Sequence, residues 1–173
     1  FAALAAGRPW LRDLLAPPVA VVKAVPVASF IILALVWLEG RSLSLFISGL
    51  MVFPPVYLTV LEGLGRTDRK LLELARAYRF SAGKTVRLIY LPALRPYILT
   101  ALTTATGLAW KSGVAAEVLC LPPRSLGNQI YYTKYYLDIP ELFAWTAVTV
   151  ALSLILERFL RFCLARWGRG WAA

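Results

Sequence analysis

The residues LSLFISGLMVFPPVYLTVL, at positions 43–61, form an apolar stretch without a single charged side chain. A helix needs roughly 20 predominantly apolar residues to cross the hydrocarbon core of a bilayer. Further stretches of comparable length lie at 18–38, 96–119 and 142–164. The sequence therefore predicts an all-α fold, a polytopic bundle of membrane helices that forms one transmembrane domain over residues 1–173.

The composition supports the same class of protein. Apolar residues make up 60% of the chain and charged residues 16%, whereas soluble domains have about 45–50% and about 25%. A soluble helical protein is the alternative, but core helices seldom reach the length of these stretches. The lipid bilayer is thus the expected surrounding of the helices.

Basic residues gather in alternate connections between the predicted spans. Most of the 19 Lys and Arg residues lie near the start of the first span, within 62–95, or at the C-terminal end. The positive-inside rule therefore predicts that the 62–95 loop and the C-terminus are cytoplasmic, and that the 120–141 loop is external. The net charge of +10 then reflects topology and anionic lipid, and no nucleic-acid partner is expected.

The basic loop carries a spaced pattern, in which Glu73-Leu74-Ala75 is followed sixteen residues after Glu73 by Ile89-Tyr90-Leu91-Pro92. This pattern resembles the EAA loop of the membrane subunits of binding-protein-dependent ABC importers, which have a MetI-like fold. In that family the loop docks on a cytoplasmic ATPase and couples it to the membrane domain. The resemblance implies a coupling loop over 68–92. Its candidate residues are Glu73, Ala75, Ala77, Arg79, Gly83, Ile89 and Pro92.

Two positions in the loop depart from the family pattern. Leu74 stands where the family has Ala, and Arg79 stands where it usually has Gly. The nearest glycine along the chain is Gly83. The turn is therefore expected later in the loop, around Gly83.

The resemblance also implies partners and location. The expected partners are a second permease subunit in a homodimer, ABC ATPase subunits and an external substrate-binding protein. ATP and Mg belong to the ATPase, so this chain is expected to be no enzyme and to bind no cofactor or metal. The location is the bacterial inner membrane. Because the family has more spans than four, residues 1–6 are expected to be the tail of a span truncated upstream.

The loop sequence predicts a short helix-turn-helix outside the membrane. Apolar residues recur at helical spacing over 68–80, with charged residues on the other side. Thr67 or Asp68 can cap this helix, and 84–90 can form a second helix that Pro92 separates from the next span. A docking helix and a helix lying on anionic lipid both fit this periodicity. The motif spacing favours docking.

Candidate residues for a translocation pathway lie within the spans. Prolines are expected to interrupt helices deep in the membrane, as they do along transport routes, although proline is also simply common in membrane helices. The 107–117 segment resembles the nitrate/sulfonate/taurine-type permeases, in which this span lines the pathway near the dimer axis. Gly107 and Gly113 are expected to permit close helix approach. The pathway candidates are Pro26, Pro54, Pro55, Trp110, Lys111 and Glu117.

Tyrosines cluster in the predicted external loop, at Tyr131, Tyr132, Tyr135 and Tyr136. They fit either the aromatic belt of a membrane interface or a surface that meets a substrate-binding protein. The sequence leaves both readings open.

The function predicted from these features is that of an ABC importer permease subunit, which forms the translocation pathway for a small solute. The alternative is a secondary transporter or channel-like membrane protein without an ATPase partner. A protein of that kind would have no use for Glu73, Ile89 and Pro92 at this spacing. The coupling loop is thus the feature that separates the two functions.

Overall fold

The computed structural model describes residues 1–169, and all regular elements in that range are helical. The all-α prediction is confirmed. The elements are α1 (Ala2–Gly7), α2 (Pro9–Ala24), α3 (Val27–Ala34), α4 (Gly40–Gly65), α5 (Arg69–Ala77), α6 (Ala82–Thr85), the π-helical turn η1 (Val86–Tyr90), α7 (Leu91–Cys120), α8 (Leu126–Tyr135) and α9 (Ile139–Arg169).

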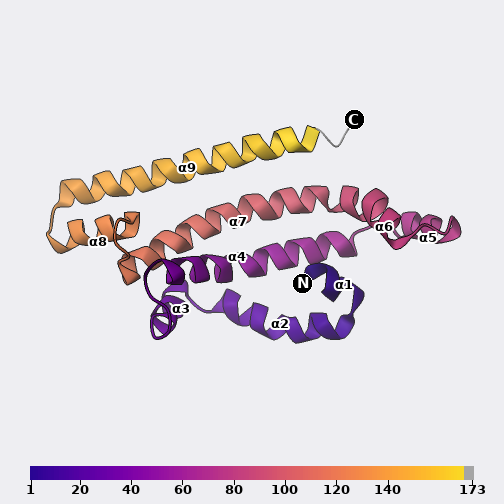
Figure 1. The fold of residues 1–173 in the computed structure, drawn as a ribbon, viewed down its shortest axis with the longest axis horizontal. Helices are drawn as coiled ribbons and strands as arrows, with labels where there is room; N and C mark the ends of the chain where they lie inside the picture. Colours follow the sequence, from indigo (N-terminus) through magenta and orange to yellow (C-terminus); the bar gives the residue numbers. More distant parts are fainter. Residues whose placement is uncertain (170–173) are drawn as a thin grey trace.

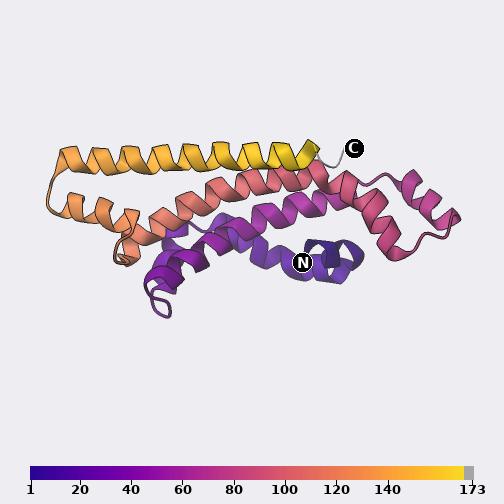
Figure 2. The same cartoon turned by 45° about the horizontal axis from the view of Figure 1, so that its top comes forward.

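The long helices α4 and α7 form the central antiparallel pair (Figure 1). α5, α6 and η1 connect them at one end, and α8 follows α7 at the other end. α9 then runs back along α7 (Figure 2). The start of α2, the α5–α6 segment and the C-terminal end of α9 consequently lie toward the same end of the molecule in both views.

Two helices, Gly40–Gly65 and Ile139–Leu164, are long and apolar enough to cross a membrane. The pair α2 and α3 passes the same test together, but the pair is bent by 102°. α7 has 30 residues, which at 1.5 Å per residue is long enough to cross a bilayer. Its many small and polar residues lower its hydropathy, so α7 is not one of the helices that pass the test. Two or three candidate spans follow from length and composition, and the four-span topology stays a prediction.

The prolines have different effects on the helices. Pro26 is the N-cap residue of α3 and lies at the 102° bend, so the predicted interruption is confirmed there. The region 18–38 is therefore not one straight helix. Pro54 and Pro55 lie inside the unbroken helix α4, and the interruption predicted at this pair is wrong. Pro54 is fully buried, so packing holds the helix together where local backbone preference would weaken it.

Small side chains bring α4 and α7 close together. The buried residues of α7 are Ala101, Ala105, Ser112 and Ala116. A Cβ atom added at Gly63 of α4 would lie 2.6 Å from the ring of Tyr97 on α7, and one added at Gly113 would lie 2.9 Å from the hydroxyl of Ser48. Close approach at Gly113 is thus confirmed, whereas Gly107 meets no other helix within the described residues, so its role stays a prediction.

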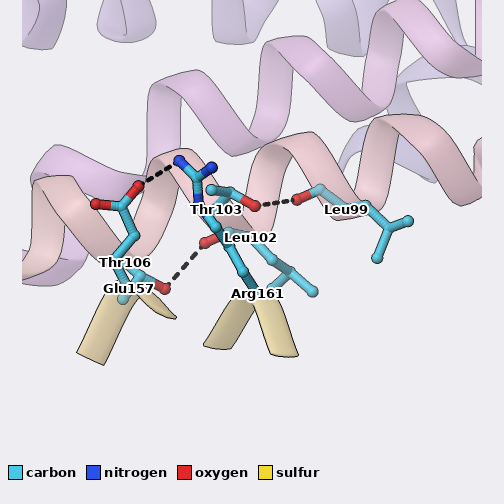
Figure 3. Close-up of polar contacts among 6 residues, drawn as sticks. All are labelled: Leu99, Leu102, Thr103, Thr106, Glu157 and Arg161. Atoms are coloured by element: carbon cyan, nitrogen blue, oxygen red, sulfur yellow. Dashed lines mark hydrogen bonds and ion pairs between the residues drawn. The ribbon is translucent and has the colours of Figure 1, made fainter. Parts of the chain in front are cut away.

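Several polar side chains on α7 and α9 bond within their own helices (Figure 3). Thr103 and Thr106 of α7 donate hydrogen bonds of 2.8 and 2.9 Å to carbonyls one turn earlier. On α9, Arg161 forms an ion pair with Glu157 at 2.5 Å. Local pairing of this kind lets a largely apolar helix carry polar residues, because few polar atoms then face hydrocarbon.

Candidate functional site: the coupling segment and the α7 residues

The helix α5 is fixed at both ends by capping interactions. At its start, the Asp68 carboxylate accepts a 2.8 Å hydrogen bond from the Lys70 amide, so Asp68 is the cap. At its end, the Phe80 amide donates to the Ala75 carbonyl at 2.8 Å, and the Arg79 amide donates to the Arg76 carbonyl at 3.0 Å. These two bonds form a Schellman motif, which ends a helix with one left-handed residue.

The left-handed residue of this motif is Arg79, whose φ is 50°. The turn therefore lies at Arg79, and the prediction of a turn around Gly83 is wrong. Gly83 lies inside α6, where the Ser81 hydroxyl accepts a bond from the Lys84 amide. The position of the turn is set by the capping hydrogen bonds of α5, which override the preference of glycine for left-handed backbone.

The second half of the segment runs into α7 without a break. Residues 85–91 all have helical backbone through η1. Pro92 lies in the first turn of α7, directly after the π-helical turn η1, and the helix continues through it. The predicted separation of the second helix from the span at Pro92 is wrong for this reason.

The segment from Asp68 to Pro92, called here the coupling segment, presents an apolar stripe to its surroundings. Leu71, Leu74 and Tyr78 are 46%, 51% and 71% exposed, and they follow one another at helical spacing on one side of α5. Glu73 is exposed on the other side of the helix. The described part of this chain therefore leaves uncovered an apolar face that a partner could bury.

The candidate residues of the coupling segment fall into a buried group and an exposed group. Ala75 and Ile89 are buried, so they hold the segment in shape. The remaining candidates are exposed: Glu73, Ala77, Arg79, Gly83 and Pro92. The stripe of Leu71, Leu74 and Tyr78 lies outside the predicted candidate residues, although its spacing in the sequence marks it as the apolar side of a helix.

The candidates on α7 do not form one cluster. Lys111 is exposed, and it has no ion-pair partner within residues 1–169. Trp110 is half-buried, and its buried indole Nε1 has no hydrogen-bond partner among the described residues. The Lys111 ammonium group thus remains available to water, a solute or another subunit.

Glu117 of α7 contacts the helix that follows. Its Oε2 atom accepts a 3.1 Å hydrogen bond from the amide of Gly127, in the first turn of α8. A Cβ atom added at Gly127 would lie 2.4 Å from the Val118 amide nitrogen and 2.4 Å from the Glu117 Cβ. Glu117 therefore positions α8 on the end of α7, a contact that the spacing of the sequence did not predict.

Comparison with known proteins identifies a family and several proteins to which this chain is similar. A model of the family described as "Binding-protein-dependent transport system inner membrane component" matches residues 1–167. The taurine transport system permease protein of Escherichia coli is 27% identical over 154 residues, which are 88% of this chain and 56% of that protein. The bicarbonate transport system permease protein of Synechococcus elongatus is 26% identical over 129 residues, 75% of this chain and 46% of that protein. The chain spans about half the length of these relatives.

Proposed function

Because the chain belongs to the family of inner membrane components of binding-protein-dependent transport systems, we propose that it acts as a permease subunit of an ABC importer. It would work with a second permease subunit, cytoplasmic ATPase subunits and an external substrate-binding protein. ATP and Mg would bind to the ATPase subunits. This chain would supply the membrane pathway and the surface that receives the mechanical work of ATP hydrolysis.

The observation that carries the coupling role is the exposed stripe on α5. Three large apolar side chains, Leu71, Leu74 and Tyr78, lie on a helix that is capped at both ends. Burying apolar area stabilises a complex by roughly 25 cal/mol per Å², and a helix with one apolar face commonly docks in a groove of its partner. A firmly capped helix suits this role, because it does not have to be ordered when the partner binds.

The residues of α7 support a role in the pathway. Lys111 is a charged residue within a helix of the membrane domain, and such residues usually face a water-filled cavity or another subunit. Trp110, its neighbour, is half-buried, so part of its side chain remains at the surface of the chain. We assign both residues to the surface that α7 turns toward the pathway or the second permease subunit.

The solute is proposed to be small and to carry an anionic group. Two relatives are named for the transport of taurine and of bicarbonate, and both compounds carry such a group. Lys111 could interact with it directly, because a cation is favourable next to an anion where little water screens the charges. A fixed positive charge in the pathway would also disfavour cationic solutes.

The proposed permease role implies an orientation of the chain in the membrane, which can be tested by cysteine labelling. In intact cells, Lys134→Cys in α8 is expected to react with a membrane-impermeant maleimide, whereas Lys84→Cys in the coupling segment is expected to react only after permeabilisation. Both lysines are exposed in the structure, so accessibility within the chain does not bias the comparison. Labelling of position 84 in intact cells, with position 134 protected, would invert the topology and rule out docking on a cytoplasmic ATPase.

A further inference from the structure

Arg79 occupies a backbone position that glycine normally takes. Its φ of 50° lies in the left-handed region, which is unfavourable for side chains with a Cβ atom. Helices that end in a Schellman motif usually place glycine there. The coupling segment therefore holds an arginine at a site where backbone energy alone would select a smaller residue.

The same motif occurs a second time in the chain, at the far end of α8. The Asp138 amide donates to the Thr133 carbonyl at 3.0 Å, and the Leu137 amide donates to the Lys134 carbonyl at 3.1 Å. Leu137 is the left-handed residue there, with φ 58°. The two sites share the backbone strain but differ in the side chain they present, so Leu137 is an internal control for Arg79.

The surroundings of Arg79 are strongly basic. Arg76 lies one turn before it, and the Lys84 Nζ atom is held 4.5 Å from the centre of the Phe80 ring. Within the described residues, Arg79 is exposed and forms no ion pair. A surface of this charge is complementary to an acidic surface.

We infer that the Arg79 guanidinium binds a carboxylate patch on the cytoplasmic ATPase subunit, next to the groove that receives Leu71, Leu74 and Tyr78. This inference rests on the proposed function. Arginine suits the contact because its planar guanidinium can pair with a carboxylate through two parallel hydrogen bonds. The side chain thus adds charge recognition to an apolar contact that has little specificity by itself.

The test compares Arg79→Gly with Leu137→Gly in the full-length permease, purified in detergent and titrated with its cognate ATPase. Both substitutions relieve the same strain, so each is expected to raise the melting temperature by about 2–4 °C. Only Arg79→Gly is expected to weaken ATPase binding, by about tenfold or more. Arg79→Lys keeps the charge without the planar fork and is expected to bind with an affinity between those of wild type and Arg79→Gly.

The outcomes separate this inference from the proposed function. If the wild type binds the ATPase and Arg79→Gly binds it equally well, the role of Arg79 is refuted while docking stands. If the wild type does not bind the ATPase at all, the proposed function itself fails. Arg79→Gly could also lose ATPase binding only in nanodiscs containing anionic lipid and not in detergent. That result would show that the guanidinium contacts lipid headgroups, and it would overturn the inference.

Discussion

Leu74→Asp is expected to abolish ATP-driven solute uptake while leaving the protein in the membrane at normal abundance. Leu74 is half exposed on α5 and lies in the middle of the stripe with Leu71 and Tyr78. A charge at this point would have to be desolvated when the stripe enters its groove. Substitution of a hot-spot residue near the centre of an interface costs about 2 kcal/mol or more, so the affinity for the ATPase should fall about 30-fold or more.

Two variants control this experiment. Leu137→Asp introduces the same change at an exposed leucine beside α8, far from the coupling segment, and should leave ATPase binding unchanged. Leu74→Met keeps an apolar side chain of similar volume and should retain most of the affinity. Normal uptake and normal ATPase binding by Leu74→Asp would show that the stripe faces something other than the ATPase.

The second large effect is expected at Lys111, where Lys111→Leu should insert into the membrane at least as well as wild type but transport poorly. A charged residue near the centre of a span costs about 2.5–3.5 kcal/mol on insertion scales, so its removal favours insertion. A hydrogen bond to a charged group contributes about 1.5–3 kcal/mol. Losing such a contact with an anionic solute predicts a fall in uptake of about tenfold or more.

The control for Lys111 is the same substitution at Lys23, an exposed lysine in the last turn of α2. A lysine near the end of a helix can extend its side chain to the membrane interface, so Lys23→Leu should transport normally. Uptake is compared after correction for the amount of permease in the membrane. Normal uptake by Lys111→Leu would mean that Lys111 is likewise directed to the interface and has no part in the pathway.

The long helices could be predicted from the sequence because they depend on continuous apolar composition. The stretches 43–61, 96–119 and 142–164 lie within α4, α7 and α9. The interruption at Pro26 was also predictable, since proline lacks the amide hydrogen that a helix interior needs. The passage of α4 through Pro54 and Pro55 was not, because it depends on tertiary packing around a buried proline.

The coupling segment shows where local reasoning reaches its limit. Its amphipathic pattern and its cap at Asp68 were visible in the sequence. The tolerance of glycine for left-handed backbone predicts a turn at Gly83, but the capping hydrogen bonds at the end of α5 place it at Arg79. The contact from Glu117 to Gly127 joins two helices across a loop, and no spacing rule for a single helix could reveal it.

The central claim, that the exposed stripe of α5 contacts the ATPase, can be tested most directly by site-specific photo-crosslinking in membranes. A photoreactive phenylalanine derivative at Tyr78 is compared with the same derivative at Tyr135 of α8, an equally exposed tyrosine at the other end of the molecule. We expect a crosslink to the ATPase subunit from position 78 and none from position 135. Crosslinks from position 78 to lipid alone, in membranes where the ATPase copurifies with the permease, would contradict the account.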